Sequence, residues 1–408
     1  MTPINGDLKS LLTLIQSAAP TLLNFCCIIN GEFLPLEDVQ NMGYDEFVSH
    51  AKGIMPRKLY KYFSNLPTTL TDPVSGEPIL DEKTGKPKTI NYSKEALKKN
   101  TVFLQSPSLF DDVYDSDISL DFETYEKIRL LEYCKRCQLS VNASMSTQEL
   151  GDALVQAVSQ RFDPAIGQAS LFTKRPDTLI EEKSNELFVL QLQIELSNHH
   201  DLGKAVGGAI VSSFKDYSRS LQNTFRASCF ATTPFSQLMW GGSYANEHKG
   251  FCVEYTVLPN DPSYTTVYYN LFPMIYCKTR PNMTERLAKV EDNDLTKEWL
   301  WDIYFHGALR KSIDWAFQNE WRLLLPMGSN LKDSGYNIPF FPITKVFLGN
   351  RMPPKERQEI IDICKVRKIP YVGVRRNPVI FEMEECPDTH SKPSTPQKLS
   401  SSFALLYI

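Results

Sequence analysis

Short apolar runs separated by turns dominate the chain from Ser228 onwards, and they set the strongest limit on its fold. The runs span 228–232, 250–257, 265–269, 273–277, 320–325, 343–348 and 370–373. Apolar runs of about four to eight residues between turn signals predict buried strands. Helices are predicted among them at 295–317 and 353–367. This half of the chain therefore predicts a fold built on a sheet.

Helical periodicity characterises the preceding segment. Residues 118–223 carry apolar side chains at helical spacing, after two predicted strands at 56–63 and 101–106. Helices that are separated from strands along the chain are typical of the α+β class. We therefore predict an α+β fold with a central mixed or antiparallel sheet, a large helical insertion and an N-terminal helical accessory.

Domain boundaries follow from these patterns. Residues 1–55 are predicted to be the helical accessory, because leucines recur there at helical spacing. Residues 56–385 are predicted to form the main α+β domain, with 118–223 as its insertion. Residues 386–408 are rich in Ser, Pro, Thr and Lys and predict a flexible tail. Turn residues within 67–90 indicate an exposed loop or hairpin, and we identify no internal repeat.

Composition excludes several classes. The 408 residues carry a net charge of −4, which gives no overall attraction to nucleic acid or to an anionic membrane. No run approaches the ~18 apolar residues of a membrane helix, and the N-terminus has no signal-peptide pattern. The nine scattered cysteines are typical of free thiols in a reducing compartment. We predict a cytoplasmic protein without a membrane segment or a metal site, since the Cys134-x-x-Cys137 pair has no second pair to complete a zinc site.

Polar and aromatic residues gather beside two predicted strands. One group runs from Trp240 through Tyr244 to His248, and the other comprises Glu320, a Trp and Arg322. Buried polar groups must be paired or they cost folding energy, so we interpret both groups as parts of a site. Glu320 could hold a sugar hydroxyl and stabilise a cationic transition state. The structural alternative is an ion pair with Arg322 that closes the sheet edge, and Trp240 could equally pack a helix-to-strand connection.

Lys61 lies between two tyrosines, Tyr60 and Tyr62, on a predicted strand and should point to the opposite face from both. It would bind phosphate or carboxylate if that face lines a cleft, and it would otherwise be a surface lysine. The chain has neither a G-x-G-x-x-G nor a G-x-x-x-x-G-K-[ST] loop, and neither H-E-x-x-H nor G-x-S-x-G. These absences argue against Rossmann, P-loop, zincin and α/β-hydrolase chemistry.

A resemblance rests on several blocks that occur in one order. They are Leu59-Tyr-Lys-Tyr62, Ser106-Pro-Ser-Leu-Phe-Asp-Asp112, Cys229-Phe-Ala231, Met239 to Glu254, Lys311 with Trp315, Asn319-Glu-Trp-Arg322 and Val346-Phe-Leu-Gly349. Over residues 56–375 the chain resembles the bacterial domain-of-unknown-function family 2971. It departs from that family at 110–113, where the family usually has Asn-Asp-Pro, and at Gly242, where it usually has His.

A second resemblance is to the three-part pattern of ADP-ribosyltransferases. In those enzymes an Arg or His on a first strand holds NAD, a Ser or Tyr on a later strand supports the nicotinamide ribose, and a Glu stabilises the oxocarbenium ion. The resemblance implies NAD as substrate and Lys61, Ser106 and Glu320 as catalytic residues, with Lys61 in place of Arg or His. The implied NAD-binding residues are Tyr60, Trp240, Tyr244, His248 and Arg322.

Three functions stay open. The first is an ADP-ribosyltransferase-like enzyme that acts on a macromolecule. Such an enzyme could serve as a toxin or as an anti-phage effector. The second is a metal-dependent nuclease acting on RNA or DNA, with Asp111, Asp112, Glu254 and Glu320 around a divalent ion. The third is a non-catalytic sensor that binds a nucleotide or a phage protein beside Trp240, with 1–55 and 118–223 as partner surfaces.

Overall fold

The computed structural model describes residues 25–72, 75–112, 114–116, 119, 121–160, 222–223, 225–285, 303–326 and 335–386. The chain divides into two compact units. The first comprises Met1–Leu109, Phe225–Lys278 and Lys311–Ile408, and the second comprises Phe110–Thr224 and Thr279–Arg310. Helices and several sheets occur together, so the predicted α+β class is confirmed.

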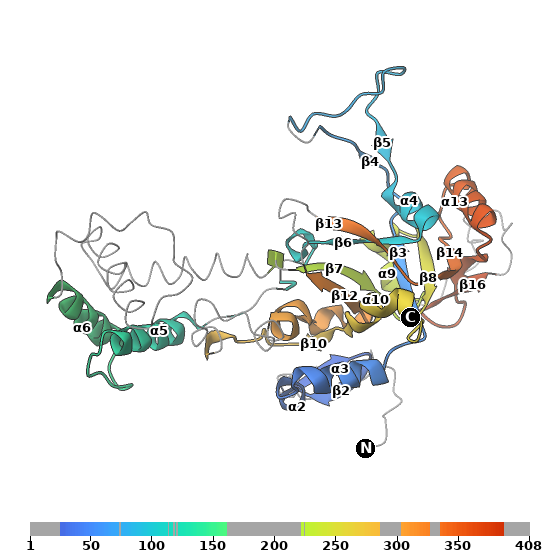
Figure 1. Cartoon of the computed structure of the whole chain (residues 1–408). Helices are drawn as coiled ribbons and strands as arrows, with labels where there is room; N and C mark the ends of the chain where they lie inside the picture. The colour runs from blue at the N-terminus through green and yellow to red at the C-terminus, as the bar shows by residue number, and fades with distance from the viewer. Residues whose placement is uncertain are drawn as a thin grey trace, which may run out of the picture. The chain divides into compact units, whose positions relative to one another are not determined.

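Two five-stranded sheets carry the first unit (Figure 1). The first sheet has the order β13 (Gly335–Pro339), β6 (Thr101–Gln105), β7 (Phe225–Phe230), β12 (Trp321–Pro326) and β9 (Leu271–Pro273), with antiparallel pairs throughout. The second has the order β16 (Met383–Cys386), β15 (Tyr371–Arg376), β14 (Ile343–Leu348), β8 (Phe251–Thr256) and β3 (Lys58–Phe63). Only β14 and β15 pair in parallel there, so the second sheet is mixed.

The N-terminal segment contributes strands as well as helices. A third sheet has the order β11 (Arg310–Ser312), β10 (Ile275–Cys277), β1 (Cys26–Ile29) and β2 (Glu32–Pro35). Asn30 and Gly31 join β1 to β2 with φ angles of 49° and 85°, as the tight turn of a two-residue hairpin requires. Helices α2 (Leu36–Gln40) and α3 (Tyr44–Gly53) follow. The described part of the predicted helical accessory is therefore a hairpin followed by two helices.

The described part of the predicted helical insertion is helical. It contains α5 (Phe122–Arg136) and α6 (Thr147–Gln160), which pack through Leu130, Leu150 and Leu154. Cys134 and Cys137 are buried in this same cluster, so they serve as small core side chains. Residues 161–221 of the predicted insertion, and 387–408 of the predicted tail, lie outside the described residues.

Two predicted elements are wrong. Residues 265–269 were expected as a strand but form α10 (Thr265–Tyr269). The side chain of Asp261 accepts a hydrogen bond from the N–H of Ser263, and Pro262 follows the cap, so a short 3-10 helix, η4 (Pro262–Tyr264), leads into α10. The predicted helix 295–317 is, in its described part, a π-helix η5 (Ile303–Ala308), strand β11 and a 3-10 helix η6 (Ile313–Gln318).

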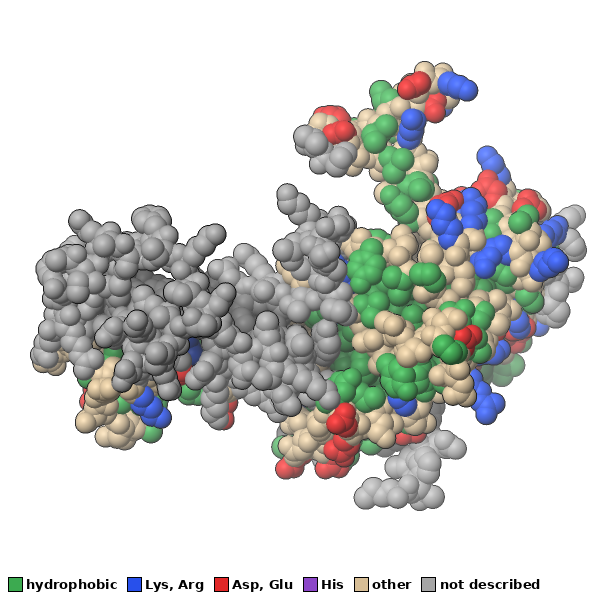
Figure 2. All heavy atoms as spheres, viewed as in Figure 1, with side chains coloured by type: hydrophobic (Ala, Val, Ile, Leu, Met, Phe, Trp, Pro, Cys, Tyr) green, Lys and Arg blue, Asp and Glu red, His purple; other side chains and the backbone are tan. Residues whose placement is uncertain are grey.

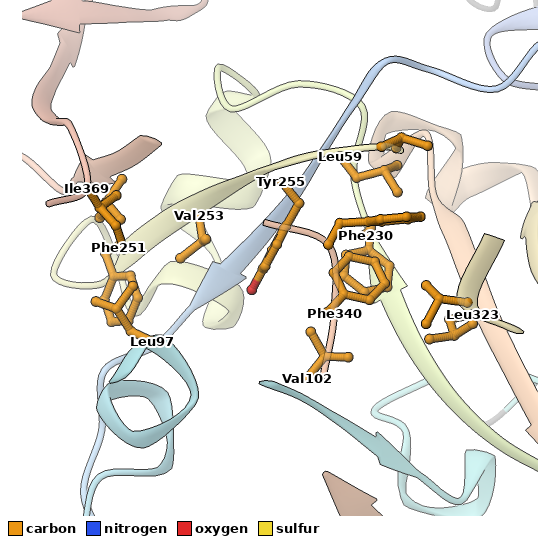
Figure 3. Packing of buried hydrophobic residues seen from close by; sticks show 14 of the residues in the cluster. Leu59, Leu97, Val102, Phe230, Phe251, Val253, Tyr255, Leu323, Phe340 and Ile369 are labelled. Atoms are coloured by element: carbon orange, nitrogen blue, oxygen red, sulfur yellow. The ribbon is translucent and has the colours of Figure 1, made fainter. Parts of the chain in front are cut away.

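Stacked aromatic rings form the core of the first unit (Figure 3). The rings of Phe230 and Phe340 are parallel, with centroids 4.4 Å apart, and Tyr255 meets both edge-on. Phe230 ends β7 and Tyr255 belongs to β8, so this cluster joins the two large sheets. A β-bridge between Tyr60 and Ala231 fixes the end of β7 beside β3. This junction positions the candidate site.

The remaining helices include α4 (Tyr92–Lys99), α9 (Gln237–Gly241) and α13 (Pro354–Arg367), and short 3-10 turns lie at η2 (Pro107–Leu109) and η3 (Ser243–Ala245).

Residues 68–90 form a branched arm whose stem is β4 (Thr68–Thr69) paired with β5 (Thr89–Ile90) (Figure 1). Its two turns, 72–78 and 81–87, share the pattern D-x-x-[ST]-G-x-P nine residues apart. In each turn the Asp side chain accepts a hydrogen bond from a backbone N–H, that of Ser75 at 2.8 Å or of Thr84 at 2.9 Å. The same local turn motif therefore occurs twice within the arm.

The two turns and the stem meet at a three-way junction. The N–H of Leu70 donates to Lys88 O, that of Ile79 to Leu70 O and that of Lys88 to Ile79 O, at 2.8–2.9 Å. The arm exposes nearly all its side chains, with charged and hydrophobic groups interspersed (Figure 2). Backbone hydrogen bonds and turns rather than a core therefore hold the arm together.

Candidate functional site

A buried ion cluster surrounds Glu320, which immediately precedes β12. Its Oε1 accepts a hydrogen bond from Nε of Arg322 at 2.8 Å and forms an ion pair with Nη2 of the same residue at 2.8 Å, and its Oε2 lies 3.3 Å from Nζ of Lys311. The three side chains are only 4% (Glu320), 0% (Arg322) and 7% (Lys311) exposed. Charges so deeply buried are tolerated only when they are paired, so each of these side chains depends on the others.

A tyrosine of another strand holds the backbone of Glu320. The N–H of Glu320 donates to Oη of Tyr276 on β10 at 2.8 Å, and the N–H of Met274 donates to Glu320 O at 2.9 Å. Burial raises the pKa of Tyr276 well above its ordinary value, and the charge of Glu320 raises it further. The Tyr276 hydroxyl therefore stays protonated and keeps Glu320 in place.

A chain of hydrogen bonds connects Glu320 to Tyr244. Lys311 Nζ also donates to Oε1 of Gln318 at 3.0 Å, and Nε2 of Gln318 donates to Oη of Tyr244 at 2.5 Å. Lys311 Nζ lies 5.2 Å from the ring centroid of Trp315, a cation–π contact. Two of the sequence blocks that carry the resemblance, the Trp-to-Glu block and the Glu-Trp-Arg block, are therefore physically linked.

Lys61 approaches the same cluster from β3. Its Nζ donates to Oγ of Ser228 and to Cys229 O, both at 3.0 Å, and Cys229 pairs with Arg322 across β7 and β12. Burial lowers the pKa of Lys61, whereas the nearby Cys229 and Glu320 oppose this change. The structure thus brings together Lys61, Glu320 and Arg322 of the predicted site.

Cys229 is the thiol of this cluster. Burial raises its pKa to about 12, and the charge of Glu320 also raises it, while Arg322, Lys61 and Lys311 lower it. The thiolate is the reactive form of cysteine, so Cys229 is a poor nucleophile at neutral pH. Its place in the site is that of a neutral, half-buried neighbour.

Trp240 is part of the core rather than an exposed platform. It is fully buried, its indole N–H donates to Pro234 O at 2.6 Å, and its ring contacts Tyr62 edge-on. The imidazole of His248 lies parallel to the indole, with centroids 6.4 Å apart. Trp240 therefore packs the helix-to-strand connection, which was the structural alternative for this residue. In that position its side chain supports the segment 241–250.

That segment has an unusual backbone. Asn246, Glu247 and His248 all have left-handed conformations, with φ of 47°, 53° and 69°. Such a run of non-glycine residues costs free energy and needs support from its surroundings. Support comes from two glycines: a Cβ at Gly250 would lie 2.0 Å from Phe63 O, and one at Gly349 would lie 2.1 Å from His248 O.

His248 has its Nδ1 buried without a hydrogen-bond partner among the described residues. Burial lowers the pKa of His248, and the cations Arg351 and Arg376 lower it further. The imidazole is therefore neutral at physiological pH. Its predicted NAD contact stays a prediction.

Tyr60 belongs to a separate cluster around Glu254. The Glu254 carboxylate accepts hydrogen bonds from Tyr60 Oη at 3.1 Å, Lys58 Nζ at 2.9 Å and Thr344 Oγ1 at 2.8 Å. Burial raises the pKa of Glu254, but the bonds from Lys58, Thr344 and Tyr60 outweigh it and lower the pKa below the ordinary value. Because adjacent strand residues face opposite sides, Tyr60 is not brought together with Lys61.

The other predicted residues are less informative. Ser106 is buried just after β6, and its hydroxyl shares a hydrogen bond with that of Ser108 at 2.8 Å; its catalytic role stays a prediction. Asp111 and Asp112, proposed for a nuclease, belong to the second unit. Within the described ranges, no group of three or more His, Cys, Asp or Glu side chains is arranged to hold a metal ion. No helix among those ranges is long and apolar enough to cross a membrane.

Sequence reasoning missed Lys311, Gln318 and Tyr276 as site residues. Lys311 was visible within a resembling block, but its link to Glu320 required the geometry. Gln318 lies two residues before Glu320 and carries no motif. Tyr276 lies 44 residues before Glu320 and nothing in the sequence indicated the contact.

Comparison with known families points to the same residues. Residues 239–323 match the family described as protein of unknown function (DUF2971). The chain resembles this family. The DUF2971 match contains Tyr244, Lys311, Gln318, Glu320 and Arg322, the whole hydrogen-bonded chain. No curated protein and no solved structure matches the chain.

Proposed function

We propose that the protein is an NAD-dependent ADP-ribosyltransferase-like enzyme. It would cleave the bond between nicotinamide and ribose and transfer ADP-ribose to a macromolecular acceptor. The observation that carries this proposal is the composition of the ion cluster: one carboxylate, Glu320, among the basic side chains of Lys311, Arg322 and Lys61.

The charges of the cluster suit NAD. Three basic side chains around one carboxylate leave a surplus of positive charge, and guanidinium and ammonium groups are the usual partners of a pyrophosphate. The half-buried members are Lys61, Lys311, Cys229 and Tyr244, whereas Glu320 and Arg322 are buried. Substrate would therefore approach from the side of these four residues.

Glu320 would act on the ribose. When the glycosidic bond breaks, its electron pair leaves with nicotinamide and positive charge develops on the ribose. A fixed carboxylate that accepts a hydrogen bond from a ribose hydroxyl stabilises that charge without reorganising. Arg322, Lys311 and the Tyr276 hydroxyl hold Glu320 in this position. The acceptor nucleophile then attacks the ribose carbon.

Nicotinamide release tests the proposal. Incubation with NAD should release nicotinamide from the wild type, and Glu320→Gln should lower the rate on the order of 10²-fold or more. Glu254→Gln is the matched control, since Glu254 is another buried, hydrogen-bonded carboxylate. It should keep the wild-type rate within about threefold.

The proposed enzymatic function would be refuted if Glu320→Gln released nicotinamide as fast as the wild type, or if the wild type released none. Tight NAD binding without release of nicotinamide would favour the sensor. Metal-dependent cleavage of RNA or DNA would favour the nuclease.

We further propose a cytoplasmic location, a toxin or anti-phage role, and partner contacts through 1–55 or 118–223. Assaying modification of nucleic acid and protein in cell extract with labelled NAD tests for a macromolecular acceptor.

A further inference from the structure

Two cysteines face each other across the N-terminal sheet. Cys27 on β1 and Cys277 on β10 are direct partners in an antiparallel register. Neither cysteine is in a disulfide, and the two are 0% and 4% exposed. The pair joins the first strand of the N-terminal hairpin to a residue 250 positions later in the sequence.

Their register suits a disulfide. Directly opposed residues of antiparallel strands have Cα atoms about 4.5–5.5 Å apart, within the roughly 4.4–6.8 Å that a disulfide spans. Their Cβ atoms are about 4.5–5.5 Å apart, against about 3.5–4.5 Å in a disulfide. A small approach of the two strands is therefore sufficient to form the bond.

We propose that Cys27 and Cys277 are a redox-modification site: a dithiol that hydrogen peroxide converts to a disulfide in the folded protein. One sulfur attacks peroxide, forming a sulfenic acid and releasing water. The second sulfur then displaces the hydroxyl of the sulfenic acid as a second water, forming the S–S bond. Both sulfurs are oxidised, and one peroxide accepts their two electrons and two protons. A small oxidant is required because both thiols are buried.

The other cysteines show why Cys27 should pair with Cys277 rather than with another thiol. Cys26 is adjacent to Cys27, but successive strand residues point to opposite faces, and Cys26 is half-buried and lies opposite Pro35. In the second unit, Cys134 on α5 and Cys137, the C-cap of that helix, lie in one buried cluster on a single helical segment rather than on paired strands.

The dithiol is connected to the Glu320 site. Tyr276, the residue before Cys277, accepts the hydrogen bond from the Glu320 N–H. Oxidation ties β1 to the strand that carries this hydroxyl. We expect it to change the rate of nicotinamide release, a consequence that rests on the proposed function, whereas formation of the disulfide does not.

Peptide mapping of the intact, folded protein tests the site. The wild type is exposed to hydrogen peroxide, remaining thiols are alkylated, and the digest is analysed without reduction. A peptide linking Cys27 to Cys277 is expected in the wild type and in Cys26→Ser, and is lost in Cys27→Ser. The double variant Cys134→Ser/Cys137→Ser should still form the link.

The proposal is overturned if Cys27 and Cys277 remain thiols, and are therefore found alkylated, while the half-buried Cys26 or Cys229 is oxidised. It is also overturned if the Cys27–Cys277 link forms only when the protein is unfolded in urea. It is also overturned if Cys27 joins another cysteine instead. Should Cys27→Ser fold poorly, the wild-type map decides alone. An enzyme that never releases nicotinamide would leave the cross-link result unchanged, so failure of the proposed function is recognised separately.

Discussion

The ion cluster around Glu320 shows how strongly one residue can depend on its neighbours. Lys311 contacts Oε2 of Glu320 and also Gln318, at distances of 3.3 and 3.0 Å. Removing one partner of a buried ion pair leaves an uncompensated charge and costs about 3–5 kcal/mol. We expect Lys311→Met to lower the free energy of unfolding by about that amount in a urea titration.

An exposed ion pair provides the control for this prediction. Lys345 lies 2.8 Å from Glu385, but the two side chains are 28% and 42% exposed. Exposed pairs contribute about 0–1 kcal/mol, so Lys345→Met should change the unfolding free energy only slightly. Equal effects of the two substitutions would show that the cluster is not a buried, interdependent group.

The buried amine of Lys52 should make the free energy of unfolding depend on pH. Burial lowers its pKa to about 7, while its Nζ donates to Tyr268 O at 2.7 Å and to Leu271 O at 2.8 Å. In the unfolded chain the pKa returns to about 10.4, so between these values the unfolded state binds more protons. The cost of charging Lys52 is therefore complete below pH 7 and is relieved as the pH rises towards 10.

Urea titrations from pH 6.5 to 9.5 measure this contribution. The stability of the wild type relative to Lys52→Met should increase with pH across that range. Lys99→Met, whose side chain is 68% exposed, is the control and should keep the wild-type slope. A wild-type slope unchanged by Lys52→Met would contradict the assignment.

Single residues of the site were predictable only where chemistry alone singled them out. Glu320, Arg322 and Lys61 are charges beside apolar runs, and the structure brings them together. Trp240 was equally prominent in the sequence, but an indole fills a core as readily as it binds a ligand, and it is fully buried. Tyr276 contacts Glu320 only through sheet pairing, which local sequence does not encode.

At the scale of elements, the segment 241–250 depends on close backbone packing. A Cβ at Gly250 would lie 2.0 Å from Phe63 O, a contact with rigid backbone rather than a movable side chain. Overpacking of this kind costs about 1–3 kcal/mol or more. We expect Gly250→Ala to lower the unfolding temperature by several degrees and Gly349→Ala to do the same.

Gly53→Ala is the matched control in the same unit. It lies in α3, and a Cβ there would meet no atom within 4 Å. Alanine favours a helix over glycine by about 0.5–1 kcal/mol, so Gly53→Ala should keep or raise the unfolding temperature. Thermal unfolding followed by circular dichroism compares the three variants.

Elements were predicted best where hydrophobic pattern and turn chemistry agreed. Strand β14 and helix α13 lie close to their predicted ranges because an apolar run and an amphipathic run are each bounded by turns. Residues 265–269 have strand propensity, yet a capped turn begins a helix there. The hairpin at Asn30-Gly31 carried a strong local signal, but the neighbouring helical pattern concealed it.

At the scale of the whole molecule, the arm of residues 68–90 should be dispensable for folding. Nearly all its side chains are exposed, and Asn91 Nδ2 donates to Asn65 O at 3.0 Å, so the ends of the arm lie together. Replacing residues 66–90 by a four-residue Gly-Ser linker should shift the unfolding temperature by no more than about 3 °C. A loss of 10 °C or more would show that the arm stabilises the first unit.

Strand order has a consequence for synthesis. β6 pairs with β7 and β13, and β12 lies between β7 and β9, so the first large sheet needs residues from 101 to 339. On the ribosome, β6 emerges long before either neighbour, and the sheet closes only after β13 has left the exit tunnel. The nascent chain must therefore keep an early apolar strand from wrong partners while more than 200 residues are added.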